Sequence, residues 1–286
     1  MIKTYYNLTK PGIIYGNAIN TAAGFFLASQ GRYDFKLLML TLVGISLVVA
    51  SACVFNNLLD KDIDAKMERT KNRAMVTGSI PKLNAIIFGS LLLISGILVL
   101  ALRTNSLALY AVLIGLFTYV LIYTFGKRYT IWGTEIGSIS GAVVPLAGYL
   151  AVTNKFDAGA AILFLIFVLW QMPHFYAIAI YRLNDYKQAG LPVLPAVKGI
   201  LRTKINILVY IIGFVIALSL LTVFGYAGYL YLTVMELLGI WWLVMAIKGF
   251  KLADDVLWAK KMFKLSLIIV LAFCVIIPID ALTNIL

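Results

Sequence analysis

The sequence predicts an all-α polytopic membrane protein with nine transmembrane helices. Three observations support this fold class. Of the 286 residues, 62% are hydrophobic and only 13% are charged. The mean hydropathy of +0.97 exceeds what a soluble domain of this length needs. The chain also contains nine apolar runs, each near the roughly 20 residues that a helix needs to cross a bilayer core.

The predicted spans follow one another through the whole chain with short loops between most of them. We therefore interpret residues 1–286 as a single transmembrane domain. In chain order the spans are 12–30, 36–58, 82–102, 106–126, 132–152, 158–180, 204–224, 227–247 and 264–284.

Charge is distributed very unevenly between the two sides of this predicted bundle. The formal net charge of +12 would also fit a nucleic-acid-binding protein. However, of the 24 Lys and Arg residues only Arg32, Lys36, Arg103 and Lys155 lie on one side. The positive-inside rule places the other side in the cytoplasm. We expect a cytoplasmic N-terminus, an outside C-terminus and no nucleic-acid partner.

The ends and the cysteines of the chain indicate its compartment. Residues 1–6 are polar and resemble neither a signal peptide nor an Arg- and Ser-rich presequence. Cys53 and Cys274 both fall inside predicted spans, which favours small buried residues over a disulfide or a zinc site. The sequence therefore predicts a multi-pass protein of a prokaryotic plasma membrane.

A polar stripe follows the second predicted span, where the apolar run of residues 35–55 ends. Asn56, Asp60 and Asp64 recur at every fourth position, and Asn57 lies three residues before Asp60. If the helix continues, these side chains share one face, with neighbouring Cβ atoms roughly 5–6 Å apart. The spacing alone leaves two interpretations open, a charged helix end that meets water and a metal site.

Cations follow this stripe at Arg69, Lys71 and Arg73. Adjacent carboxylates repel each other unless a cation lies between them. Mg²⁺ is commonly held by one or two carboxylates together with substrate phosphates. Carboxylates beside cations would therefore suit a metal–diphosphate substrate.

The end of the sixth predicted span repeats the arrangement. Tyr181 and Asp185 lie four residues apart, Lys187 follows, and a loop with two prolines leads to the next helix. The two motif loops, 56–81 and 181–203, are four helices apart and both predicted to be cytoplasmic. A weak internal repeat of this kind indicates a site where the halves meet, which favours the metal interpretation of the first stripe.

Three polar residues inside predicted spans are candidates for the same site. His174 is the single histidine of the sequence, and Gln171 precedes it by about one turn. A buried histidine is either a hydrogen-bonded core residue or a functional group, such as a haem-iron ligand or a proton acceptor. Asn17 either lines a cavity or only joins two helices by a hydrogen bond.

The first stripe resembles an aspartate-rich motif of the UbiA-type intramembrane prenyltransferase superfamily. That motif usually reads Asn-Asp-x-x-Asp-x-x-x-Asp, so Asn57 stands where Asp is commoner. The second motif is usually Asp-x-x-x-Asp and here begins with Tyr181, one carboxylate short. With these two departures, the motifs resemble those of the branch of the superfamily that uses haem as acceptor. Further similar stretches are 8–12, 62–73, 171–180 and 185–195, although Ala74 replaces a usual Pro.

The resemblance implies nine helices around a central cavity with the active site on the cytoplasmic side. It implies transfer of a farnesyl group from farnesyl diphosphate to a vinyl group of haem b, with addition of water and with Mg²⁺ bound to the diphosphate. The product, haem O, would pass to haem A synthase or to a terminal oxidase. The resemblance also implies a lateral opening from the cavity to the membrane lipid.

The resemblance also implies roles for particular residues. The implied metal ligands, which are also catalytic, are Asn57, Asp60, Asp64 and Asp185. Tyr181 is a further catalytic candidate. The implied diphosphate-binding residues are Arg69, Lys71, Arg73 and Lys187, and the implied haem-binding residues are His174, Asn17 and Gln171.

Two other functions remain open at this point. Prenylation of an aromatic quinone precursor is disfavoured by the missing carboxylate of the second motif. A secondary transporter would need acidic or unwound segments at mid-membrane. Glu236 is the residue that keeps this alternative open, whereas the acidic motifs at helix ends favour chemistry.

Overall fold

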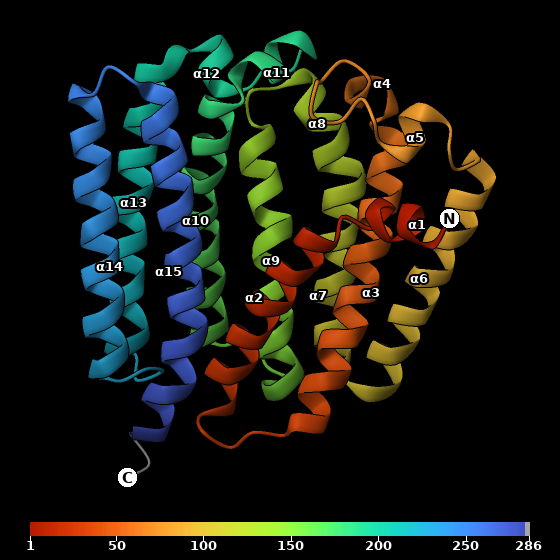
Figure 1. The fold of residues 1–286 in the computed structure, drawn as a ribbon. Coiled ribbons are helices and arrows are strands. Elements are labelled where there is room, and N and C mark those ends of the chain that lie inside the picture. The colour runs from red at the N-terminus through yellow and green to blue at the C-terminus, as the bar shows by residue number, and fades with distance from the viewer. Residues whose placement is uncertain (284–286) are drawn as a thin grey trace.

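The computed structural model describes residues 1–283, and each regular element within them is a helix (Figure 1). The predicted all-α fold is confirmed. The elements are α1 (Ile2–Leu8), α2 (Pro11–Ser29), α3 (Phe35–Leu59), α4 (Lys61–Asp64), α5 (Ala74–Thr77), α6 (Lys82–Arg103), α7 (Ser106–Phe117), the π-helix η1 (Thr118–Tyr123), α8 (Thr124–Tyr129), α9 (Gly133–Thr153), α10 (Ala158–Tyr181), α11 (Leu183–Gln188), α12 (Leu194–Val197), α13 (Gly199–Val223), α14 (Tyr229–Lys248), the 3₁₀-helix η2 (Gly249–Lys251) and α15 (Asp255–Thr283).

Within residues 1–283, eight helices are long and apolar enough to cross a membrane. The ninth predicted span, 12–30, forms the 19-residue helix α2. It falls outside this set because Asn17 and Asn20 make it less apolar. The count of nine spans and the sides of the two termini therefore stay predictions. The last residue of the predicted span 264–284 lies outside the described residues.

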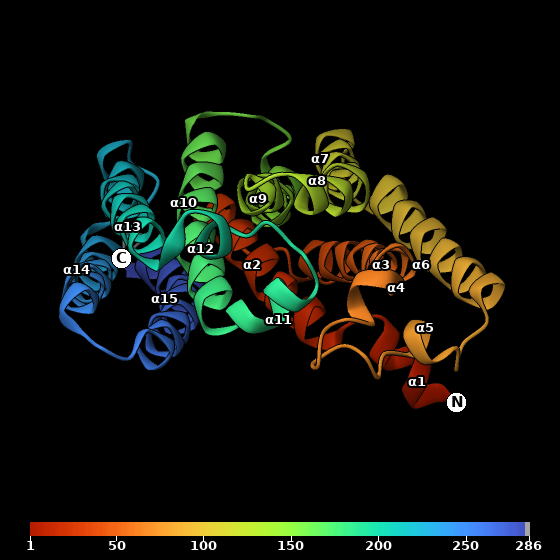
Figure 2. The ribbon, with the colours of Figure 1, turned by 90° about the horizontal axis from the view of Figure 1, so that it is seen from above.

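Helix α2 runs obliquely through the middle of the bundle and packs against α9 (Figures 1 and 2). The two backbones touch at two glycines. A Cβ atom on Gly24 would lie 1.9 Å from the Pro145 carbonyl oxygen, and one on Gly148 would lie 2.2 Å from the Thr21 carbonyl oxygen. Only small residues permit so close an approach of two helices. This contact fixes α2 beside the residues that line the central cavity.

The short helices α4, α5, α11 and α12 gather at one end of the bundle, where α3 and α10 finish (Figure 1). The two motif loops therefore lie at the same end, as their predicted common side requires. The four Lys and Arg residues set apart by the charge pattern belong to the loops and helix ends at the opposite end. Helix α15 also finishes there, at Thr283.

Candidate active site

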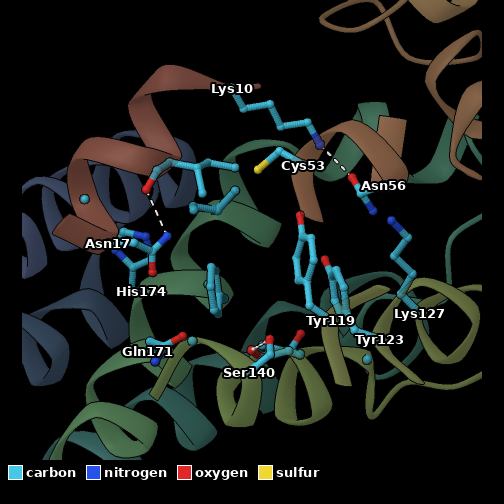
Figure 3. A pocket seen from close by; sticks show the side chains of 18 of the residues that line it. Lys10, Asn17, Cys53, Asn56, Tyr119, Tyr123, Lys127, Ser140, Gln171 and His174 are labelled. Atoms are coloured by element: carbon cyan, nitrogen blue, oxygen red, sulfur yellow. Dashed lines mark hydrogen bonds between the residues drawn. The ribbon is translucent and has the colours of Figure 1, made fainter. Parts of the chain in front are cut away.

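A cavity of about 880 Å³ lies in the centre of the bundle. Its lining residues come from α2, α3, α4, the α7–η1–α8 stretch, α9, α10, α15 and the two motif loops. Figure 3 shows two chemically different ends, with Lys10 and Lys127 at one and Gln171 and His174 at the other. The wall between them is largely apolar. Such a cavity suits an elongated molecule with an anionic head and an apolar body.

Asn56, Asp60 and Asp64 form one continuous face at the charged end of the cavity. Helix α3 ends at Leu59, but the helical hydrogen bonds continue beyond it. The amide of Asp60 donates to the Asn56 carbonyl at 2.9 Å, and that of Asp64 donates to the Asp60 carbonyl at 2.8 Å. Helix α4 therefore keeps the register of α3. Each of the three residues is only 3% exposed.

Cations pair with both buried carboxylates. Lys127 forms a short ion pair with Asp60, and Arg73 donates to Asp64 at 2.6 Å. The Asn56 amide group donates to Asp60 at 2.7 Å and accepts from Lys10 at 2.6 Å. Positive and negative groups thus alternate around the charged end. Buried charges need such partners, and an anionic ligand with a metal ion can take over the same contacts.

Arg128, near the end of α8, forms hydrogen bonds to α4 and to the end of α3. Its guanidinium makes a two-pronged contact with Asp62, at 2.8 and 2.9 Å, and donates to the Leu59 carbonyl at 2.5 Å. This hydrogen-bonded pairing lowers the pKa of the Asp62 carboxyl. The turn that carries Asp60 is therefore held from the side of α8.

Asn57 does not share the face of the other stripe residues. Its side chain points to α1, donates to the Leu8 carbonyl at 2.8 Å and is absent from the described cavity lining. Adjacent residues on a helix point about 100° apart, so Asn56 and Asn57 cannot both face the cavity. Asn56 occupies the position toward the carboxylates. A metal-binding role of Asn57 stays a prediction.

Several residues of the charged end were missed by the sequence interpretation. Lys10 precedes α2, and burial lowers the pKa of its ammonium to about 8. Tyr119 and Tyr123 stack with ring centroids 5.5 Å apart and line the cavity beside Lys127. Both tyrosines belong to η1, and π-helical turns of this kind are frequent at functional sites. The Lys10-Pro11 pair and the Lys127-Arg128 pair at helix ends were the available signals.

The predicted cations and the second motif are only partly brought to the cavity. Arg69, Arg73 and Tyr181 line it, as do Arg182 and Tyr186. Lys71 pairs with the exposed Glu68 at 2.6 Å. Asp185 lies 3.9 Å from Arg182, and neither Asp185 nor Lys187 is among the described lining residues.

The other end of the cavity carries the predicted acceptor residues. Asn17, Gln171 and His174 all line it, together with Trp170. The Gln171 side chain packs closely on Gly141, where a Cβ atom would lie 2.0 Å from the Gln171 Oε1 atom. Amide and imidazole groups on an aromatic, apolar wall suit a large flat acceptor with few polar contacts.

Glu236, the residue that kept the transporter interpretation open, has a structural partner. Ser219 of α13 donates to it at 2.6 Å. Glu236 is not among the described cavity-lining residues. Its position between α13 and α14 is typical of an interhelical hydrogen bond.

The chain belongs to the UbiA prenyltransferase family, whose model matches residues 17–268. The predicted family is thus confirmed, and prenyl transfer is favoured over transport. Among its relatives is the protoheme IX farnesyltransferase of Serratia proteamaculans, which is 52% identical over 281 residues, covering 98% of this chain and 95% of the relative. The protein of that name from Pectobacterium carotovorum is 52% identical over 283 residues, covering 98% and 96%.

Solved structures share the fold at lower identity. A digeranylgeranylglyceryl phosphate synthase superposes with a TM-score of 0.82 and 23% identity, covering 99% of each chain. A UbiA homologue from Archaeoglobus fulgidus, bound to GPP and Mg²⁺, has a TM-score of 0.69 and 17% identity, covering 96% of this chain and 99% of its own. These similarities show the fold.

Proposed function

We propose that this protein transfers the farnesyl group of farnesyl diphosphate to a vinyl group of haem b, with addition of water, to give haem O. The observation that carries this proposal is the 52% identity to protoheme IX farnesyltransferases over 98% of the chain. The cavity is consistent with it, because its charged end suits a diphosphate and its other end suits a large flat acceptor.

Asp60 and Asp64 are the residues that would hold Mg²⁺, together with the Asn56 side chain. Buried carboxylate and amide oxygens are the hard ligands that Mg²⁺ prefers, so the residues fit the ion. Bound there, Mg²⁺ would neutralise the charge that develops on the diphosphate as it leaves. Asn57 and Asp185, the other predicted ligands, would need to turn toward the cavity. The Archaeoglobus homologue of the same fold is bound to GPP and Mg²⁺, which supports a prenyl diphosphate with Mg²⁺ as the donor substrate.

Lys10, Lys127, Arg69 and Arg73 would bind the diphosphate oxygens. Each of them lines the cavity. The two cations now paired with Asp60 and Asp64 would exchange that contact for the phosphate oxygens when substrate and metal enter. Preorganised positive charge beside the leaving diphosphate stabilises the negative charge that develops on it in the transition state.

Cleavage of the C1–O bond leaves an allylic cation, and the diphosphate carries away the bonding electrons. The π electrons of the haem vinyl group form the new C–C bond to C1, which moves the positive charge to the carbon beside the porphyrin. Water adds to that carbon and releases one proton. The apolar wall and the Tyr119–Tyr123 stack would keep water from the first cation.

The site would open toward the cytoplasm of a prokaryotic cell. The motif loops at this end carry most of the basic residues, and such loops face the cytoplasm by the positive-inside rule. Haem O released there would pass to haem A synthase or to a terminal oxidase in the same membrane.

The test uses the protein in lipid nanodiscs with haem b, farnesyl diphosphate and Mg²⁺, followed by mass analysis of the extracted haem. We expect a haem heavier by one farnesyl group and one hydroxyl group. Asp60→Asn should lower turnover by at least 100-fold, while Asp254→Asn, at an exposed helix start on the same end, should not. Unchanged haem with the wild-type protein would refute the proposal. Diphosphate release only when a quinone precursor is added would instead indicate a prenyltransferase that acts on aromatic acceptors.

A further inference from the structure

Ser266 of α15 anchors two aromatic residues of α10 at the acceptor end of the cavity. The Nδ1 atom of His174 lies 2.7 Å from the Ser266 Oγ atom. The indole of Trp170 donates to the Ser266 carbonyl at 2.9 Å. Ser266 is completely buried, whereas His174 and Trp170 line the cavity. Ser266 is thus hydrogen-bonded to two residues that line the cavity.

The contacts of Ser266 determine which nitrogen of His174 carries the proton. Its Oγ atom lies 2.6 Å from the carbonyl oxygen of Phe263. A carbonyl oxygen has no proton to give, so the hydroxyl proton of Ser266 must point to it. The Oγ atom can then only accept from His174. Nδ1 therefore carries the ring proton, and Nε2 carries the free electron pair.

The neighbouring rings restrict the orientation of this imidazole. Trp170 stacks on it with centroids 5.0 Å apart and an interplanar angle of 28°. Phe263 contacts it with centroids 4.8 Å apart. Because Nδ1 is held by Ser266 and the ring cannot turn freely, Nε2 is the nitrogen available to a ligand in the cavity.

We propose that Ser266 is a positioning residue that presents the Nε2 atom of His174 to the iron of haem b. This inference rests on the proposed function, which supplies the haem. A metal-binding histidine usually donates its other N–H group to an acceptor, which fixes the tautomer and strengthens the ligand. Coordination at His174 would anchor the acceptor at one end of the cavity. Lys10 and Lys127, which would bind the diphosphate, lie at the other end (Figure 3).

Ligation is tested by adding ferric haem b to the purified protein in nanodiscs without farnesyl diphosphate. Magnetic circular dichroism is expected to show a nitrogen ligand in the wild type and its loss in His174→Ala. Free imidazole should restore the signal in the variant. An identical spectrum for the wild type and His174→Ala would overturn the inference.

The role of Ser266 is tested on the ferrous complex by resonance Raman spectroscopy. Ser266→Ala should lower the iron–histidine stretching frequency and weaken haem binding by about 10- to 100-fold. The matched control is Ser138→Ala. Ser138 is 1% exposed and donates to the Glu135 carbonyl, three residues earlier, at 2.7 Å, whereas the hydroxyl bonded to His174 is that of Ser266. Equal frequencies in the two variants would overturn the positioning role.

Turnover measurements separate this inference from the proposed function. Haem O formation by a wild type whose haem lacks histidine ligation would overturn the inference and leave the proposed function intact. Histidine ligation that is lost in His174→Ala, in a protein that forms no haem O, would support the ligand assignment while refuting the farnesyl transfer.

Discussion

Lys10 is expected to make diphosphate binding sensitive to pH just above neutrality. Burial lowers the pKa of its ammonium from 10.5 to about 8, and repulsion from Arg73 and Lys127 acts in the same direction. With this pKa, about nine-tenths of the Lys10 side chains are charged at pH 7 and about one-tenth at pH 9. A diphosphate binds the charged form. The apparent KM for farnesyl diphosphate should therefore rise about tenfold between pH 7 and pH 9.

Steady-state haem O formation in nanodiscs across this pH range measures the effect. Lys10→Arg should flatten the profile, because a guanidinium stays charged throughout. Lys82→Met, at an exposed lysine that begins α6, should keep the wild-type profile. A Lys10→Arg protein that retains the wild-type inflection would refute the assignment of this pKa to Lys10.

The stability of the free protein should respond to Lys10 in the opposite direction. Between about pH 8 and 10.5 the folded chain has released the Lys10 proton, whereas the unfolded chain still binds it. The unfolded state then holds more protons, so this group makes the free energy of unfolding rise with pH across the window. Thermal unfolding of the wild type and of Lys10→Met across this pH range measures the effect. The contribution of Lys10 to the rise of stability with pH should be absent in the variant.

Two further substitutions probe the acceptor end of the cavity and the contact of Asn57 with α1. Gly141→Ala should displace Gln171, because the new Cβ atom would lie 2.0 Å from its Oε1 atom. The KM for haem b should rise several-fold with little change in the KM for farnesyl diphosphate, and the reverse pattern would contradict the assignment of this end. Asn57→Ala should lower the free energy of unfolding by about 1–2 kcal/mol, because the buried hydrogen bond to Leu8 is lost. An increased Mg²⁺ requirement in that variant would instead support the metal role predicted from the motif.

Local periodicity in the sequence was sufficient to predict the helical fold and the face shared by Asn56, Asp60 and Asp64. It could not predict Lys10 and Lys127, because they reach this face from 46 and 67 residues away. Such contacts depend on how the helices pack, and no pattern within one helix contains that information.

The same reasoning explains the different outcome at the second motif. Residues four apart share a face only while the helix continues. The register survives the end of α3, but α10 ends at Tyr181 and a new helix begins after Arg182. The spacing of Tyr181 and Asp185 therefore did not place both side chains on the cavity. Tyr186 lines it in place of Asp185.

The close contact between α2 and α9 has a consequence for the biogenesis of the protein. Translocon-mediated insertion selects segments by their own apolarity, and α2 carries two asparagines near its centre. Its backbone packs closely against Pro145 and Gly148 of α9, which are more than a hundred residues later in synthesis. The first long helix of the chain is therefore expected to reach its final depth late, after α9 has emerged from the ribosome. Truncated nascent chains that end before α9 should leave α2 accessible to water-soluble labels.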